Sequence, residues 1–185
     1  TLGSYYAIRD HQDINPEFGT KEDFKALVMK AKSLGFRIIL DWVANHTGLD
    51  NVWTKSNKEY FILSENGDFT ERNGWDDVID LNYSNPNLRT AMKNCMQYWI
   101  DAYGIDGFRC DMAMLVSLDF WKETRREIDP NNQLIWLGEC EQIEYFEAFD
   151  LQYGWEWIQK TKKISQENLN KHQLETLIRA YQSKT

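Results

Sequence analysis

The sequence has 185 residues and a formal net charge of −8, from 21 Lys and Arg against 29 Asp and Glu. Its 42% hydrophobic content supplies enough apolar material for a core, and the length fits one domain. It contains no apolar run of roughly 18 residues and does not open on a signal-peptide pattern, so no membrane span is expected. The acidic balance argues against a nucleic-acid partner, because binding phosphates requires clustered Lys and Arg.

The first predicted elements are a helix and a strand. Apolar residues recur at helical spacing over 22–34, which predicts a helix with one buried stripe. Thr20 and Asp23 form a capping-box pattern before it, and a glycine ends it. Residues 36–40 then predict a strand that Asp41 closes. The helical stripe comprises Phe24, Leu27, Val28, Ala31 and Leu34.

The following segment, residues 48–80, is polar and has no sustained periodicity. We expect a long irregular excursion, a kind of segment that often carries function. Its aromatic side chains are candidates either for packing or for contacts with a sugar ring; they are Trp53, Tyr60, Phe61 and Trp75.

Helices and strands alternate in the rest of the chain. Asn85 and Pro86 predict the cap and first position of a helix that runs to Gly104. Because strands separated by helices imply βαβ units, the sequence predicts a parallel sheet and an α/β fold. Trp99 and Trp121 lie on helical stripes and are expected in the core. The later predicted elements are strands at 105–111, 134–137 and, more weakly, 146–151, a helix at 118–128, and a polar helical tail from residue 155.

The three cysteines predict no metal site and no disulfide framework. Cys95, Cys110 and Cys140 are odd in number, far apart and set in apolar surroundings. Free cysteine behaves as a small hydrophobic residue, so we expect three buried reduced thiols.

Polar residues follow the predicted strands at equivalent positions, including Arg109, Asp111 and Glu139. Active sites of (β/α)8 barrels gather at the carboxyl ends of the strands. Asp111 and Glu139 are 139 − 111 = 28 residues apart, close to one βα repeat of about 31 residues. Two carboxyls about 5 Å apart are the arrangement of a retaining glycosidase. Taken singly, a carboxylate at a strand end is more often a helix cap or a salt-bridge partner, and Arg109 could either form an ion pair or keep Asp111 ionised.

Five motifs in order carry a resemblance to a known family. They are DWVANHT at 41–47, GFRCD at 107–111, Gly138-Glu139, VIDLNY at 78–83, and the opening segment with Tyr6, Asp10 and 15–20. Their order and spacing resemble those of the α-amylase family, glycoside hydrolase family 13, up to about residue 150. The resemblance implies that Asp111 is the nucleophile, that Glu139 is the general acid and base, and that Arg109 holds Asp111.

The resemblance also implies roles in binding. Asp41 and His46 would shape the subsite for the attacked sugar, and Tyr6 would stack on that sugar's face. Asn45 corresponds to a calcium ligand in many members of the family, but the other ligands come from an excursion that is short here, so calcium is left open. No cofactor is required for the chemistry.

The implied architecture is an internal part of a (β/α)8 barrel, about strands three to six. It would occupy residues 1–185, with 48–80 as a short domain B and the N-terminal and C-terminal parts of the barrel missing. The family's third catalytic Asp follows a His on strand seven, and this chain has no such His-Asp pair. We therefore expect that carboxylate beyond the chain, and the chain alone to be inactive.

The function that these observations predict is retaining hydrolysis of α-1,4-glucosidic bonds in starch-type α-glucans or maltooligosaccharides. Met114 and Leu115 stand where typical α-amylases carry a Lys-His pair. This departure leaves open a transglycosylase or a cyclodextrin- or pullulan-degrading enzyme. A non-catalytic carbohydrate-binding homologue and an unrelated α/β protein are further alternatives, which the intact carboxylates and the ordered motifs disfavour. The sequence assigns neither a compartment nor an oligomeric state.

Overall fold

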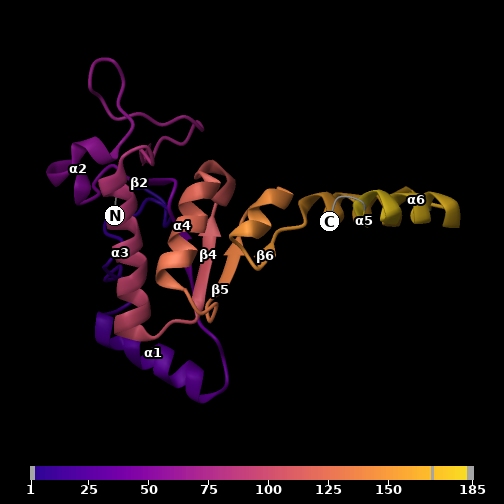
Figure 1. Ribbon diagram of the computed structural model, residues 1–185, viewed down its shortest axis with the longest axis horizontal. Coiled ribbons are helices and arrows are strands. Elements are labelled where there is room, and N and C mark those ends of the chain that lie inside the picture. The colour runs from indigo at the N-terminus through magenta and orange to yellow at the C-terminus, as the bar shows by residue number, and fades with distance from the viewer. Residues whose placement is uncertain (1–2, 168, 183–185) are drawn as a thin grey trace.

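The structure, a computed structural model, describes residues 3–167 and 169–182 (Figure 1). The strands and helices follow one another along the chain in an α/β order. They are α1 (Lys21–Ser33), β1 (Ile39–Val43), β2 (His46–Gly48), α2 (Trp53–Ser56), η1 (Lys58–Tyr60), β3 (Val78–Asp80), α3 (Pro86–Tyr103), β4 (Gly107–Asp111), η2 (Ala113–Leu115), α4 (Leu118–Ile128), β5 (Ile135–Gly138), η3 (Ile143–Glu147), β6 (Leu151–Gln152), α5 (Trp155–Glu167) and α6 (Lys171–Gln182).

In these residues a sheet of four parallel strands, in the order β1-β4-β5-β6, organises the fold. Asp41 on β1 lies beside Arg109 on β4, and Gly107 lies beside Ile135 on β5. The crossovers from β1 to β4 and from β4 to β5 contain α3 and α4, so both are βαβ units. The predicted α/β class is therefore confirmed.

The core lies between the sheet and the helices α3 and α4, which pack against each other. Aromatic side chains fill much of it, and Trp99 and Trp121 are buried there as predicted. All three cysteines lie in the described part of the chain, where they are buried and free, again as predicted. The largest fully buried side chains of the core are Trp121, Trp136, Phe108, Phe120, Phe149, Leu88, Met92 and Met96.

The structure confirms the predicted helix ends. These ends could be predicted because they depend on residues that are close together in the sequence. The Thr20 hydroxyl accepts a hydrogen bond from the Asp23 amide, and the Asp23 carboxylate accepts one from the Thr20 amide. Asn85 accepts amides at the start of α3, and Gly104 ends that helix in the left-handed conformation with φ 64°.

The predicted buried stripe of α1 is wrong in two of its five positions. Val28 is buried and Phe24 packs edge-on against Trp99, but Leu27 and Leu34 are each more than 60% exposed. The helix meets the core only along its Phe24–Val28 side, and no described residue covers the rest of the stripe.

Two predicted strands are placed incorrectly. The first begins at Ile39 rather than at residue 36, because the Phe36 amide bonds to the Ala31 carbonyl to close α1. The strand also continues to Val43, so Asp41 lies in the middle of β1 instead of closing it. Residues 146–151 form no strand apart from Leu151, which begins β6. The first two of these residues belong to the 3-10 turn η3, where the Tyr145 hydroxyl donates to the Met114 and Val116 carbonyls.

The segment 48–80 consists mostly of loops, as predicted, with α2 and η1 as short helices. Strands β2 and β3 pair in antiparallel fashion, His46 against Asp80, and fasten both ends of the segment beside β1. Tyr60 and Phe61 are buried, so these two candidate aromatics pack the segment onto the core.

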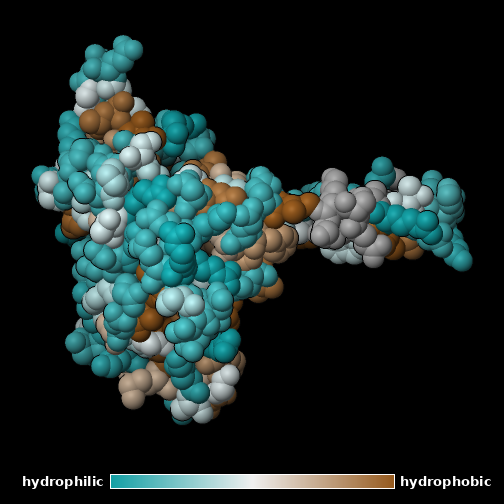
Figure 2. Space-filling model, viewed as in Figure 1, coloured by the Kyte–Doolittle hydropathy of each residue, from teal (hydrophilic) through white to brown (hydrophobic). Residues whose placement is uncertain are grey.

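Helices α5 and α6 project from the β6 edge of the body as an arm (Figure 1). The visible face of the body is largely hydrophilic, with apolar surface near the base of this arm (Figure 2). No helix of the described residues is long and apolar enough to cross a membrane.

Candidate active site

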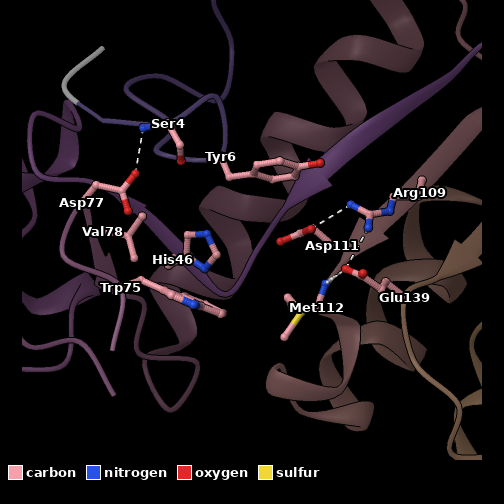
Figure 3. A pocket seen from close by; sticks show the side chains of 10 residues that line it. All are labelled: Ser4, Tyr6, His46, Trp75, Asp77, Val78, Arg109, Asp111, Met112 and Glu139. Atoms are coloured by element: carbon pink, nitrogen blue, oxygen red, sulfur yellow. Dashed lines mark hydrogen bonds and ion pairs between the residues drawn. The ribbon is translucent and has the colours of Figure 1, made fainter. Parts of the chain in front are cut away.

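A pocket of about 360 Å³ lies at the carboxyl ends of β1 and β4, between the sheet and the segment 48–80 (Figure 3). Carboxylates and an arginine line one side, and aromatic rings and a histidine line the other. The lining residues are Ser4, Tyr6, His46, Trp75, Asp77, Val78, Arg109, Asp111, Met112 and Glu139.

Arg109 is the centre of the charged side of the pocket. Its Nη1 donates to Asp41 Oδ1 and to Asp111 Oδ1, each at 2.7 Å. Its Nη2 lies 2.8 Å from Glu139 Oε2. Burial lowers the pKa of Arg109, but the bonds to Asp41 and Tyr153 outweigh it and raise that pKa, so the guanidinium stays charged. One cation therefore holds three carboxylates, which come from β1, from β4 and from the residue that follows β5.

Strand β4 supplies both Arg109 and Asp111 because alternate residues of a strand face the same side. The intervening Cys110 and the preceding Phe108 face the core and are fully buried. Gly107 starts the strand at φ 153°, and a Cβ there would overlap the carbonyl oxygen of Ile135. This glycine permits the close approach of β4 and β5 at the amino ends of the two strands.

Glu139 follows β5 and is fixed by its own backbone and by the turn after β4. Its amide donates to the Cys110 carbonyl at 2.9 Å, and its Oε2 accepts the Met112 amide at 2.9 Å. Met112 has φ 42°, a left-handed conformation that costs a non-glycine residue energy. This conformation points the Met112 amide at the Glu139 carboxylate.

The pKa of Asp111 is raised from its ordinary value to about 6. Burial is the largest cause, Arg109 lowers the pKa by a smaller amount, and the Glu139 carboxylate raises it further. The sequence predicted only the lowering by Arg109. The direction is reversed because the Asp111 side chain is 9% exposed, and desolvation of a buried carboxylate exceeds the benefit of the shared cation.

The opposite wall of the pocket is built from His46 and Trp75. His46 is buried at the start of β2, and Trp75 packs edge-on against its ring at 5.1 Å. Burial lowers the pKa of His46 despite the nearby Asp80 and Asp77 carboxylates, so the ring is neutral near pH 7. A neutral imidazole can both donate and accept hydrogen bonds with a polar ligand.

Tyr6 closes the third side of the pocket (Figure 3). Its hydroxyl donates to Asp41 Oδ2 at 3.5 Å, and the Asp41 charge, followed by burial, raises its pKa. The ring is 44% exposed, so its face is available to a ligand. Of the predicted residues, Tyr6, His46, Arg109, Asp111 and Glu139 line this one cavity. Asp41 is bonded to two of them, Tyr6 and Arg109, but is not itself a lining residue.

Asn45 is different from the other predicted residues. It is buried, and its Nδ2 donates to the His46 Nδ1 at 3.3 Å. Within residues 3–167 and 169–182, no three His, Cys, Asp or Glu side chains gather in a way that could hold a metal ion. Calcium also accepts amide and backbone carbonyl oxygens as ligands, so calcium binding at Asn45 stays a prediction.

Several residues that line the pocket or contact its lining residues were not singled out from the sequence. Ser4 donates its amide to Asp77 Oδ2 at 2.7 Å and joins the opening segment to the segment 48–80. Tyr153 follows β6 and accepts a hydrogen bond from Arg109 Nε at 3.2 Å. Its position after a strand is a signal that could have identified it, whereas nothing local marks Ser4 or Asp77.

The fold and the pocket define a class: an α/β protein of the barrel type whose parallel strands present acidic residues and an arginine at their carboxyl ends. The model of the alpha-amylase catalytic domain matches residues 3–173. The chain belongs to the alpha-amylase family, and its sheet is part of a (β/α)8 barrel.

Relatives share this similarity along most of the chain. Alpha-amylase 3 of Dictyoglomus thermophilum is 31% identical over 178 residues, covering 77% of this chain and 35% of its own. The crystal structure of an alpha-amylase from Lactobacillus plantarum is 35% identical with a TM-score of 0.88, covering 99% of this chain and 47% of its own. A noncanonic maltogenic alpha-amylase from Thermotoga neapolitana is 39% identical with a TM-score of 0.87, covering 100% of this chain and 43% of its own. The chain therefore spans less than half the length of these relatives.

Proposed function

We propose that the protein containing this chain is a retaining glycoside hydrolase that cleaves α-1,4-glucosidic bonds in starch-type α-glucans or maltooligosaccharides. The observation that carries the proposal is the sharing of Arg109 by Asp111 and Glu139. Because both carboxylates bond the terminal nitrogens of one guanidinium, they are held close together. A short distance between the two carboxyl groups is typical of a retaining enzyme, which needs about 5 Å. An inverting enzyme needs about 6.5–9.5 Å.

In the proposed first step, an Asp111 oxygen forms a bond to the anomeric carbon while the glycosidic C–O bond breaks. Glu139 gives its proton to the leaving oxygen, which departs as a hydroxyl. In the second step, Glu139 takes a proton from water, the water oxygen attacks the anomeric carbon, and the bond to Asp111 breaks. Arg109 holds both carboxylates in place through each step, and the two inversions retain the anomeric configuration.

The remaining walls fit a sugar ring. A pyranose presents apolar C–H faces edged with hydroxyls, so it suits an aromatic face beside polar groups. In the proposal Tyr6 stacks on the attacked sugar, His46 hydrogen-bonds its hydroxyls, Asp41 helps shape the subsite, and Trp75 supports His46. The family's third carboxylate belongs to residues outside this chain, so we expect the 185 residues alone to be inactive.

A second candidate is an enzyme for cyclic or branched glucans or for glucosyl transfer. Met114 and Leu115 lie on η2 directly after the β4 end, where they replace the Lys-His pair of typical α-amylases. The similar proteins include a cyclomaltodextrinase and an oligo-1,6-glucosidase, so membership of the family does not fix the bond. Products from maltotriose, a cyclodextrin and pullulan distinguish the two candidates.

The test uses the full-length protein with maltotriose as substrate. We expect hydrolysis whose first product is the α-anomer in NMR spectra, and loss of turnover in Asp111→Asn. Asp101→Asn changes an exposed aspartate on α3 and is the matched control, with activity expected within about twofold of the parent protein. Initial β-anomer, or undiminished turnover in Asp111→Asn, would disprove the mechanism, and inactivity of the parent protein on all three glucans would favour a non-catalytic relative.

A further inference from the structure

Tyr153 contacts the Arg109 side chain at the one nitrogen that the carboxylates leave free. Nη1 of Arg109 bonds Asp41 and Asp111, Nη2 bonds Glu139, and Nε donates to the Tyr153 hydroxyl at 3.2 Å. The guanidinium carbon also lies 5.7 Å from the centre of the Tyr153 ring. Tyr153 therefore makes both a hydrogen bond and a cation–π contact with the cation of the site.

The backbone places Tyr153 next to Glu139. Strand β6 pairs with β5 so that Gln152 lies beside Gly138, and the following residues, Tyr153 and Glu139, come level with each other. The Tyr153 amide donates to the Cys140 carbonyl at 3.1 Å. The ring of Tyr153 is further supported by Trp155 at 5.3 Å. The hydroxyl is thus held on the same framework that holds the Glu139 carboxylate.

The geometry points to Tyr153 as a positioning residue that fixes the guanidinium plane of Arg109, an inference that rests on the proposed glycosidase function. A guanidinium is planar, so its Nε contact fixes where both terminal nitrogens lie. Without that contact, rotation about the Cδ–Nε bond lets Nη1 and Nη2 follow whichever carboxylate attracts them most. Asp41 is the most exposed of the three carboxylates, so Arg109 could follow it outward and leave its joint contact with Asp111 and Glu139.

The neutrality of the tyrosine hydroxyl matters for this role. A fourth carboxylate at Nε would compete for the cation that Asp111 and Glu139 share, whereas a hydroxyl satisfies Nε–H without adding negative charge. Tyr153 does not line the pocket, so it acts through Arg109 rather than on the sugar. Its loss should therefore slow turnover and leave substrate affinity largely unchanged.

The test compares Tyr153→Phe, Tyr153→Leu and the parent protein on 4-nitrophenyl α-maltoside, with Asp111→Asn as the reference for lost chemistry. Tyr153→Phe keeps the ring and removes only the hydroxyl. We expect its kcat to fall about 10-fold with KM within about twofold, because a hydrogen bond to a charged group contributes about 1.5 kcal/mol or more. Tyr153→Leu should lower kcat further, since it also removes the ring.

Tyr103→Phe is the matched control, because it removes a hydroxyl that bonds Tyr98 on α3. We expect its kcat and KM to stay within about twofold of the parent values. Unchanged kcat in Tyr153→Phe, or a fall in kcat equalled in Tyr103→Phe, would overturn the role of the hydroxyl. If the parent protein is inactive while Asp111→Asn is equally inactive, the proposed function fails instead, which separates the two failures.

Discussion

Replacing Arg109 by lysine keeps the positive charge and removes the shape that lets one cation serve several carboxylates. In the structure, Nη1 of Arg109 bonds Asp41 and Asp111. Its Nη2 contacts Glu139, and its Nε donates to Tyr153. A lysine ammonium is a single nitrogen on a flexible stem, and it cannot span these positions together. If the lysine of Arg109→Lys keeps its contact with Asp111, it therefore loses the contacts with Glu139 and Tyr153.

The expected loss follows from these contacts. A hydrogen bond between charged groups contributes about 1.5–3 kcal/mol and a weaker one about 1 kcal/mol, which together give about 2.5–4 kcal/mol. At about 1.4 kcal/mol per tenfold in rate, kcat/KM should fall about 60- to 700-fold. The acid limb of the pH profile should also rise above about 6, because a weaker cation contact leaves burial and Glu139 to raise the pKa of Asp111 further.

The assay is the initial rate on 4-nitrophenyl α-maltoside between pH 4.5 and pH 8 in the full-length protein. Arg89→Lys is the matched control, since Arg89 also bridges two carboxylates, Asp119 and Glu123, but does so between α3 and α4 away from the pocket. We expect that control to lower stability and to leave kcat/KM within about twofold. A normal rate and an unshifted acid limb in Arg109→Lys would refute the idea that the shared guanidinium organises the site.

Two further predictions concern stability. Burial lowers the pKa of His11 to about 4 from 6.5, so native stability should decrease as pH falls from about 6.5 towards 4. The full effect is about 3 kcal/mol, and His11→Phe should remove that part of the pH dependence in urea unfolding; equal pH dependence in both proteins would count against it. Gly107→Ala should destabilise the protein by more than about 3 kcal/mol or prevent folding, because its Cβ overlaps the Ile135 carbonyl. Gly67→Ala, with a positive φ but open space around it, should cost about 1 kcal/mol in thermal melts, and equal losses in the two variants would disprove the steric argument.

The parts of the fold that could be predicted from the sequence depend on neighbours along the chain. The capping box of Thr20 and Asp23, the Asn85 cap and the Gly104 stop are chemical signals within a few residues. The grouping of Asp111 with Glu139 was also predictable, because consecutive parallel strands bring their ends to one edge.

The parts that could not be predicted depend on contacts between distant segments. The exposure of Leu27 reflects which neighbours α1 meets, and the periodic pattern does not contain that information. The contact of Trp75 with His46 requires the segment 48–80 to fold back over β1. The raised pKa of Asp111 follows from the depth of its burial, which the adjacent Arg109 in the sequence does not reveal.

The identity of the nucleophile is the central claim, and trapping the covalent intermediate tests it most directly. A fluorinated α-glucosyl fluoride reacts by forming a bond from a carboxylate oxygen to the anomeric carbon while fluoride leaves, and the ring fluorine slows the hydrolysis that follows. Mass spectrometry of the full-length protein after this reaction should show one glucosyl adduct, located by peptide mapping on Asp111. An adduct on another residue, or an unmodified Asp111 in a protein that turns over maltotriose, would contradict the account.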